Sequence, residues 1–432
     1  MFVRAPVLRA LAAIAATVAV VVVPPATVGA ARQLPRVTPL TGAVQVSAGG
    51  DHTCAIVPPK GVECWGRNNK GQLGTGAFGG ISTAAVTVVG LTRVRQISAG
   101  GSHTCALPAG GKTKGEVECW GLNGSGQLGD NSVAASAVPV FVHTSAGNPS
   151  PLTGVISISA GGNHTCAVIK SAKASIGDVV KCWGLGTSGQ LGNGAFVTRH
   201  APVTVSGLSK RVTIVSAGGA HTCAMWFNGP AWCWGNGSKG QLGNGAIVNH
   251  AAPVRVVGLV GVHQISAGGS HSCAVAHLAT GQHVKALCWG LNDVGQLGKG
   301  AFNAGNACAG NACQDTPVAV VGLPSPPSGV TAGGAHTCAV GGFDPGMTSG
   351  SFVECWGLRF DGQLGIGPGA NTNQPTLAVP GGYTNPGYNR PSAGANHTCA
   401  LYGGYVECWG QGNFGQLGDG SVADSPYPST VQ

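Results

Sequence analysis

Charged residues are scarce in this 432-residue sequence, since only 9% of the residues are Asp, Glu, Lys or Arg. The formal net charge is +9, but the basic residues are spread along the chain without a run of five or six. Nucleic-acid-binding domains concentrate positive charge in a patch or a stripe. We therefore expect no nucleic-acid partner, and we interpret the excess charge as a solvated basic surface.

Long apolar runs are also absent, apart from a short one at the N-terminus. It extends from Ala10 to Val23, whereas a membrane-spanning helix needs ~20 residues. Arg4 and Arg9 precede it, a pair of prolines ends it, and the small residues Val28-Gly29-Ala30 follow. This three-part pattern predicts a secretory signal peptide over residues 1–30. An uncleaved membrane anchor is the alternative.

Removal of the signal peptide leaves residues 31–432 as the folded part. This part has no expected membrane span, and loss of Arg4 and Arg9 reduces its net charge from +9 to +7. An exported protein, secreted or at the cell surface, lies in an oxidising compartment where disulfides persist. The even number of cysteines, sixteen, agrees with such a location.

Glycine is abundant, at 75 residues, but it has no strict triplet period, which excludes a collagen-like chain. Instead one unit recurs seven times: Ala-Gly-Gly-x-His-Thr-Cys-Ala, a variable segment, Cys-Trp-Gly and Gly-Gln-Leu-Gly. In the fifth copy Ser272 replaces the threonine. The histidines recur every 50 to 65 residues, a period that predicts a propeller or a solenoid. They are His52, His103, His164, His221, His271, His336 and His397.

The shortest copy indicates how the cysteines pair. Gly403-Gly404 separates two strand-like runs, and glycine adopts the positive φ angles of a two-residue hairpin turn at little cost. Counting outward from the turn places Cys399 opposite Cys408 in a non-hydrogen-bonded pair, with Cα atoms ~4.5 Å apart. We therefore predict a cross-strand disulfide in every copy, and a small disulfide-closed loop elsewhere. The predicted disulfides are Cys54–Cys64, Cys105–Cys119, Cys166–Cys182, Cys223–Cys233, Cys273–Cys288, Cys308–Cys313, Cys338–Cys355 and Cys399–Cys408.

Each unit contains four strand-like runs. Two flank the hairpin turn, and two lie between successive hairpins, such as 201–205 and 212–215. A proline near the start of the first of these suits an outer, edge strand. Four strands in seven copies predict an all-β fold, a seven-bladed β-propeller with about four strands per blade. A linear β-solenoid is the alternative. A Pro-Val run occurs near both termini, at 34–37 and at 426–431, so the sequence leaves open which end closes the ring.

The repeated pattern resembles the regulator of chromosome condensation repeat family over essentially the whole mature chain. The family implies a seven-bladed propeller, and its eukaryotic founder is a nuclear exchange factor for a small GTPase that also binds chromatin. This sequence differs in its export signal and in the cysteine pair of every repeat, which argue against a nuclear or cytosolic exchange role. The fold also resembles secreted bacterial propellers that bind other proteins, including a class of β-lactamase inhibitor proteins.

The repeated side chains have structural explanations. We expect each histidine to hydrogen bond the backbone at a blade junction, because the spacing of zinc ligands is missing and the nearby cysteines are oxidised. We expect the seven Cys-Trp-Gly tryptophans to lie in the core between blades. Gly-Gln-Leu-Gly lacks the spacing of a phosphate-binding loop and predicts a turn with positive φ angles. The glutamates that precede a cysteine are expected on a solvated strand face; they are Glu63, Glu118, Glu354 and Glu407.

The differences between copies are better indicators of function, because loops carry function while the repeated scaffold carries stability. Four insertions stand out: 141–151, 302–315, 341–351 and 381–391. If they gather on one rim, they form a binding face. Trp226 and Trp232 lie outside the repeated pattern, near a turn, and are either core residues or binding aromatics. The candidate binding residues are Trp226, Trp232, Phe302, Asn303, Asn311 and Asp315.

We therefore expect an exported, non-catalytic binding scaffold that engages a protein or a cell-envelope polymer through rim loops. We expect no cofactor and no metal, and we expect a monomer. The first alternative is a propeller-type enzyme acting on a carbohydrate or a peptide, which would need carboxylates or a metal at the central mouth of the ring. The second is a guanine-nucleotide exchange factor, by family analogy.

Overall fold

The computed structural model describes residues 38–110, 115–171, 178–208, 212–278, 283–302, 307–308, 311–323, 326–341, 352–378 and 388–432. Residues Pro39–Gln432 form one compact unit. The region of the predicted signal peptide lies outside the described residues.

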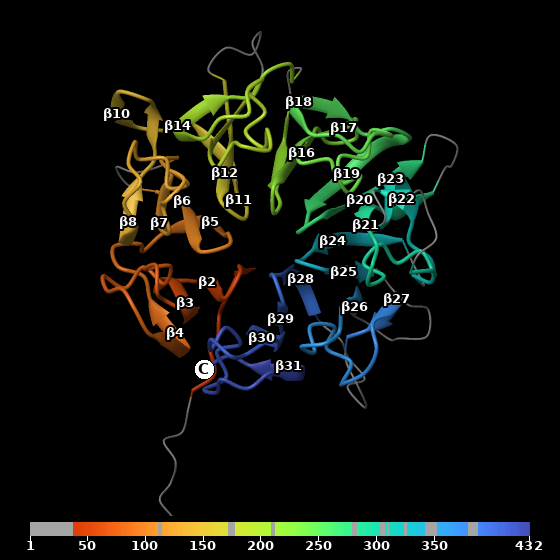
Figure 1. Cartoon of the computed structure of the whole chain (residues 1–432). Helices are drawn as coiled ribbons and strands as arrows, with labels where there is room; N and C mark the ends of the chain where they lie inside the picture. The colour runs from red at the N-terminus through yellow and green to blue at the C-terminus, as the bar shows by residue number, and fades with distance from the viewer. Residues whose placement is uncertain are drawn as a thin grey trace, which may run out of the picture. The chain divides into compact units, whose positions relative to one another are not determined.

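Unit Pro39–Gln432 forms a ring of seven antiparallel sheets, each of which is one blade of a propeller (Figure 1). The described residues form β-strands and no helix. Within a blade the four strands pair in chain order, so that each blade is one contiguous stretch of chain. The predicted seven-bladed propeller is confirmed, and we number the blades in chain order.

The four strands of each blade occupy equivalent positions. The first, inner strands are β1 (Gln45–Ala48), β5 (Val94–Ala99), β11 (Val155–Ala160), β15 (Ile214–Ala217), β19 (Leu259–Ala267), β24 (Pro327–Ala332) and β28 (Tyr388–Ala393). The second strands are β2 (His52–Val57), β6 (His103–Pro108), β12 (His164–Ile169), β16 (His221–Met225), β20 (His271–Leu278), β25 (His336–Gly341) and β29 (His397–Tyr402). The third strands are β3 (Gly61–Arg67), β7 (Glu118–Gly121), β13 (Val179–Gly184), β17 (Ala231–Gly235), β21 (Val284–Leu291), β26 (Phe352–Gly357) and β30 (Tyr405–Gly410).

The outer strands include the proline-containing runs, as the sequence predicted. They are β4 (Ile81–Thr87), β8 (Ser136–Phe141), β14 (Arg199–Thr204), β18 (His250–Arg255), β23 (Asn311–Ala319), β27 (Thr372–Leu377) and β31 (Ser425–Thr430). Three further strands lie outside the four-strand pattern of the blades. β9 (His143–Ser145) pairs with β10 (Asn148–Pro151) after blade 2, and β22 (Ala307–Cys308) extends blade 5.

The hairpin of blade 7 has the register that the sequence predicted, with Cys399 opposite Cys408. Gly403 and Gly404 have φ angles of 56° and 90°, as a tight turn of this kind requires. In all seven blades the paired cysteines have Cα atoms 4.0–4.1 Å apart, the close approach of a non-hydrogen-bonded pair. One disulfide per blade is therefore confirmed, and an eighth joins Cys308 to Cys313.

The C-terminus completes the last blade, which answers the question that the sequence left open. β31 pairs with β30 as the outer strand of blade 7. The chain before β1 then joins the same blade, since the Leu40 amide donates to the Val431 carbonyl and the Gly42 amide donates to the Gly404 carbonyl. Both ends of unit Pro39–Gln432 are thus hydrogen bonded to blade 7. The run 34–37 lies outside the described residues.

Seven separate cores fill the spaces between blades, and each contains one disulfide and one tryptophan. The tryptophan of one blade packs against the disulfide of the preceding blade: Trp120 lies with Cys54 and Cys64, and Trp65 closes the ring against Cys399 and Cys408. The same arrangement recurs at the other five junctions. The expected place of these tryptophans between blades is therefore confirmed.

The meander topology gives the ring two distinct faces. The Ala-Gly-Gly turns join the first strand to the second, and the Gly-Gln-Leu-Gly loops join the third to the fourth, so both lie at one end of each sheet. We call this the Gly-turn face. The turns between the second and third strands, and the connections to the next blade, lie at the other end, which we call the hairpin face.

Candidate functional site

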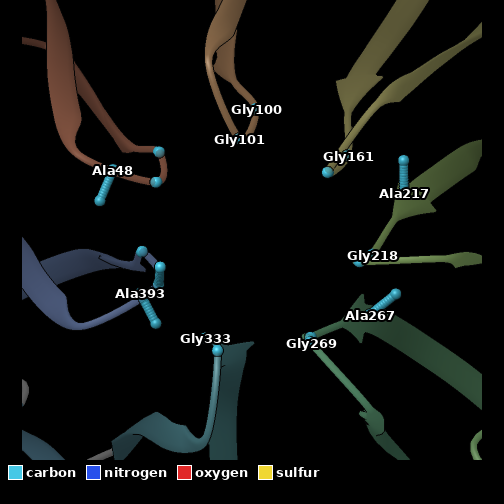
Figure 2. A pocket seen from close by; sticks show the side chains of 18 of the residues that line it. Ala48, Gly100, Gly101, Gly161, Ala217, Gly218, Ala267, Gly269, Gly333 and Ala393 are labelled. Atoms are coloured by element: carbon cyan, nitrogen blue, oxygen red, sulfur yellow. The ribbon is translucent and has the colours of Figure 1, made fainter. Parts of the chain in front are cut away.

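The centre of the ring is an opening bordered by seven equivalent turns, six of them Ala-Gly-Gly and the seventh Ala393-Gly394-Ala395 (Figure 2). The cavity there holds about 160 Å³, and only alanine and glycine residues line it. Its walls therefore offer methyl groups, Cα atoms and peptide groups. The carboxylates that the enzyme alternative would need at the central mouth are not among these lining residues.

A closed ring of backbone hydrogen bonds surrounds this opening. In each turn the amide of the third residue, a glycine in six turns and Ala395 in the seventh, donates to a carbonyl in the turn of the next blade, at 2.9–3.0 Å. The seven bonds run from Gly50 to Gly100, Gly101 to Gly161, Gly162 to Gly218, Gly219 to Gly268, Gly269 to Gly333, Gly334 to Gly394 and Ala395 to Gly49. These peptide groups are occupied in holding the blades together.

The close approach of the turns explains their glycines and gives a first prediction. A Cβ atom on Gly162 would lie 2.6 Å from the Gly219 carbonyl oxygen. We expect Gly162→Ala to lower the free energy of unfolding by about 1–3 kcal/mol, as overpacking does. The seventh copy already has Ala395 at this position, so Ala395→Gly is the matched control, with an expected change below about 1 kcal/mol. Urea denaturation checks both, and equal effects would contradict the steric explanation.

The repeated histidines connect neighbouring blades through a side chain. Each Nε2 lies 2.7–2.9 Å from a hydroxyl oxygen of the next blade. The pairs are His52–Thr104, His103–Thr165, His164–Thr222, His221–Ser272, His271–Thr337, His336–Thr398 and His397–Thr53. The expected blade junction is correct, but the expected backbone partner is wrong, because the repeated hydroxyl of the adjacent blade takes that place.

Each hydroxyl also determines which ring nitrogen of its histidine carries the proton. It donates its proton to the backbone carbonyl of the Gly-Gln-Leu-Gly glutamine at 2.8–3.3 Å. The same carbonyl accepts the indole N–H of the next blade's tryptophan at 2.9–3.0 Å. Because the hydroxyl proton is used, Nε2 must be the donor to the hydroxyl oxygen, and Nδ1 carries no proton in the neutral ring.

Burial keeps these rings neutral. It lowers the pKa of His52, His164 and His271 to about 4. Burial, with the neighbouring repeat histidines, lowers the pKa of the other four to about 3. Each Nδ1 is also buried without a hydrogen-bond partner in the described part of the chain, so that a proton there would find no acceptor.

The other predicted motifs also serve the scaffold. The first and last glycines of Gly-Gln-Leu-Gly have positive φ angles, as in Gly71 (77°) and Gly74 (67°), which confirms the predicted turn. The expectation of a solvated strand face is wrong for Glu63, which is only 5% exposed. Its carboxylate pairs with Lys60 across the short hairpin tip, at 3.3 Å, which compensates the charge in this buried position.

Metal and thiol chemistry find no support in the described residues. These contain no group of three or more His, Cys, Asp or Glu side chains placed to hold a metal ion. All sixteen cysteines are described, and all are in disulfides. No helix among the described residues could cross a membrane.

The hairpin face has an aromatic cluster that breaks the sevenfold repeat. Trp226 and Trp232, from the hairpin of blade 4, are half-buried and meet edge to face with ring centroids 4.7 Å apart. Phe227 at the tip is 61% exposed, and its ring lies 5.5 Å from that of His263 in blade 5. His263 lies 5.8 Å from His277. We call these five residues the aromatic cluster.

The cluster is held in place by backbone bonds between two blades. The Asn228 amide donates to the Val262 carbonyl at 2.9 Å, and the Val262 amide donates to the Gly229 carbonyl at 3.0 Å. Sequence reasoning found the two tryptophans but missed Phe227, His263 and His277. These three residues could have been found from the sequence, because they occur only in the copies that form blades 4 and 5 and not at the equivalent positions of the other copies.

The four insertions do not gather on one face. Segments 141–151, 341–351 and 381–391 connect strand ends on the hairpin face, whereas 302–315 connects β21 to β23 on the Gly-turn face. Residues 342–351 and 379–387 themselves lie outside the described part. The candidate binding residues are therefore divided between opposite faces of the ring.

Part of segment 302–315 forms contacts within the propeller itself. Phe302 is 37% exposed and its carbonyl accepts the Asn292 side-chain amide at 2.6 Å. Asn311 begins β23, and the Asp315 carbonyl accepts the Gly245 amide at 2.9 Å, a bond between blades that recurs around the ring. Asn303 lies outside the described residues.

These features define a class of protein: a seven-bladed propeller of disulfide-pinned repeats whose repeated polar groups join blade to blade. The chain belongs to the regulator of chromosome condensation (RCC1) repeat family. One model of this repeat matches residues 64–107, 114–168, 180–225, 228–275 and 285–340, which is more than half of the chain. A second model of the repeat matches 43–72, 94–127 and 212–241.

Several curated proteins are similar to this chain. The ultraviolet-B receptor UVR8 of Arabidopsis thaliana is 31% identical over 286 residues, 64% of this chain and 58% of that protein. The mitochondrial RCC1 domain-containing protein RUG3 of the same plant is 29% identical over 320 residues, 72% of this chain and 64% of that protein. The chain spans less than two thirds of the length of either relative.

Solved structures share the fold. Prp20p from Saccharomyces cerevisiae, whose binding to Gsp1p and histones has been described, has a TM-score of 0.68 at 21% identity, over 91% of this chain and 87% of that one. Human WBSCR16 has a TM-score of 0.68 at 21% identity, over 85% of this chain and 94% of that one. At these identities the likeness concerns the fold alone.

Proposed function

We propose that the chain is an exported, non-catalytic binding scaffold that holds a protein or a cell-envelope polymer on its hairpin face. The aromatic cluster carries this proposal. Tryptophan and other aromatic side chains contribute most to binding where they are partly exposed on a rigid support. Phe227 and the two tryptophans meet this description, and these two tryptophans lie outside the Cys-Trp-Gly motif that contains the other seven.

The repeat residues support the non-catalytic part of the proposal. The histidine, threonine, glutamine carbonyl and tryptophan of each copy are all engaged in bonds between blades. A catalytic base needs a pKa near the working pH and access to substrate, whereas the histidines are buried and have a lowered pKa. Ligand binding is then left to the residues that differ between copies.

Two observations support export. The N-terminal sequence has the charge, apolar run and small residues of a signal peptide. The chain also contains eight disulfides, which form and persist in oxidising compartments. Export predicts a mature chain that begins near Ala30 and has no free thiol, which intact mass before and after reduction with alkylation would show.

The test of binding is affinity capture from extracellular and envelope fractions, followed by identification of the ligand and titration with it in purified form. The cluster variant carries Phe227→Ser and Trp232→Glu. Glutamate is the residue at the position of Trp232 in four other copies, so the scaffold accommodates it. The control on the opposite face carries Phe302→Ser at the start of segment 302–315, where the side chain is 37% exposed.

We expect the parent and the control to retain the ligand at high salt, where purely electrostatic binding is screened. We expect the cluster variant to bind at least tenfold more weakly, since interface tryptophans commonly contribute 2 kcal/mol or more. Retention by the cluster variant with loss by the control would move the binding site to the Gly-turn face. Capture of nothing by any of the three would contradict the scaffold proposal.

A further inference from the structure

A second feature of the hairpin face is a cavity between blades 1 and 2, separate from the aromatic cluster. It has a volume of about 470 Å³. Its walls come from three connections: the hairpin tip of blade 1, the link from β4 to β5, and the end of β6. The lining residues are Ile56, Pro58, Pro59, Gly61, Thr92, Arg93, Val94, Ala109 and Gly110.

The walls are apolar and fixed in position. Ile56 is buried, Pro58 and Pro59 have rigid rings, and Val94 pairs with the last residue of β6. The Ala109 amide donates to the Arg93 carbonyl at 2.9 Å, which joins two of the three wall segments. Gly61 allows the hairpin of blade 1 to pack against the link from β4 to β5, because a Cβ atom there would collide with the Leu91 carbonyl. The cavity is therefore a preformed feature of the fold.

Arg93 is the charged residue of the lining. Its guanidinium lies at the mouth beside Gly110, where a Cβ atom would be 4.0 Å from Nη1. Within the described residues it forms no ion pair and no side-chain hydrogen bond. The nearby Lys60 is instead paired with Glu63. An apolar cavity thus has one permanently charged donor at its mouth, the Arg93 guanidinium. The parallel N–H groups of a guanidinium match the two oxygen atoms of a carboxylate.

The geometry points to a binding site for an aliphatic carboxylate between blades 1 and 2. The alkyl chain lies against Ile56, the two prolines and Val94, and the carboxylate accepts hydrogen bonds from the Arg93 guanidinium, with the Thr92 hydroxyl beside it. This ligand class matches both parts of the site: a neutral alkane would leave Arg93 unused, and a small inorganic anion would leave the apolar walls wet. The site does not depend on the function proposed above.

The test is calorimetric titration of the oxidised protein with hexanoate, octanoate and decanoate, each below the concentration at which it forms micelles. We expect affinity to rise by up to about fourfold for each added methylene group that enters the cavity. Decanol, which has the chain without the charge, should bind at least tenfold more weakly than decanoate, since hydrogen bonds to charged groups contribute ~1.5–3 kcal/mol.

Three variants distinguish this site from non-specific binding. Arg93→Gln should lower decanoate affinity about tenfold while leaving decanol affinity unchanged. Arg255→Gln, at an exposed arginine in blade 4, is the matched control and should bind as the parent does. Ala109→Phe, at an exposed position on the cavity wall, should abolish binding by filling the space. Near-ultraviolet circular dichroism confirms that each variant is folded.

Several results would overturn the assignment. They are absence of decanoate binding to the parent, equal losses in Arg93→Gln and Arg255→Gln, and undiminished binding by a folded Ala109→Phe variant. Loss of the macromolecular ligand through Phe227→Ser and Trp232→Glu concerns the other pair of blades. The experiments therefore show separately whether the carboxylate site fails and whether the macromolecular binding site fails.

Discussion

Lowering the pH from 7 to 4 is expected to unfold the propeller, with the loss of stability beginning near pH 6.5. Seven buried histidines have a pKa of about 3 or 4 in the folded state, against 6.5 for the ordinary side chain. A depressed pKa favours folding above pH 6.5, where both states are neutral. As the pH falls further, the unfolded chain takes up protons that the folded ring excludes, until the pH reaches the folded pKa.

The magnitude makes this the dominant acid effect. Each histidine contributes up to about 1.4 kcal/mol per pH unit, and together they exceed the ~5–15 kcal/mol that stabilises a typical domain. Glu118 and Asp361, whose pKa values are raised by burial and a neighbouring carboxylate, act in the opposite direction, but they are partly exposed. We therefore expect no folded protein at pH 4.

Urea denaturation between pH 4.5 and 7.5 measures this effect directly, since the slope of the unfolding free energy against pH gives the number of protons taken up. We expect a slope approaching seven protons near pH 5. His164→Gln should lower the slope by one proton, since this ring has a lowered pKa in the folded state. A slope of one proton or less for the parent would contradict the neutral, buried state of the ring of histidines.

The local part of this architecture follows from the sequence. A two-residue Gly403-Gly404 turn fixes the register of a hairpin, and the register fixes which cysteines face each other. Only neighbours along a short stretch are involved, so counting residues suffices. The period of the repeat likewise predicts the number of blades, because each sheet must bury its faces against the next.

Contacts between blades are harder to predict, because their partners are distant in the chain. Six histidine–hydroxyl pairs are 51 to 66 residues apart, as in His221–Ser272 and His271–Thr337, and the pair His397–Thr53 is 344 residues apart. The sequence shows that histidine and threonine recur together, but not that each histidine bonds the threonine of the next copy. The decisive detail, that the hydroxyl donates to a glutamine carbonyl, needs the position of Gln72 against Thr104.

The candidate binding residues illustrate the same limit. The sequence indicated that Trp226 and Trp232 depart from the repeat, which is a local observation. It did not show that Phe227 reaches His263 in the next blade, nor that segment 302–315 lies on the opposite face. Both facts depend on the direction in which each strand runs within the ring. This direction follows from the order of the strands in the chain, but only once the first and last strand of each blade are known.

Removal of one blade disulfide is expected to cost at least about 3 kcal/mol of stability. Cys166 and Cys182 are separated by 16 residues and close a loop that the chain-entropy model values near 3 kcal/mol. Their sulfur atoms are also fully buried in the core that contains Trp234, so Cys166→Ala with Cys182→Ala leaves a cavity and adds a packing loss. The measurement is the free energy of urea unfolding of this double variant under oxidising conditions.

The loop disulfide provides the comparison. Cys308 and Cys313 are separated by only five residues, for which the same model gives about 2 kcal/mol. They also lie outside the seven cores between blades, so Cys308→Ala with Cys313→Ala should cost less than the blade variant. An equal cost, or a blade variant that loses less than about 1 kcal/mol, would show that hydrogen bonds and tryptophan packing hold the blades without help from the disulfides. The larger loss in the blade variant would instead make oxidation a condition for folding, because all seven blades share the same construction.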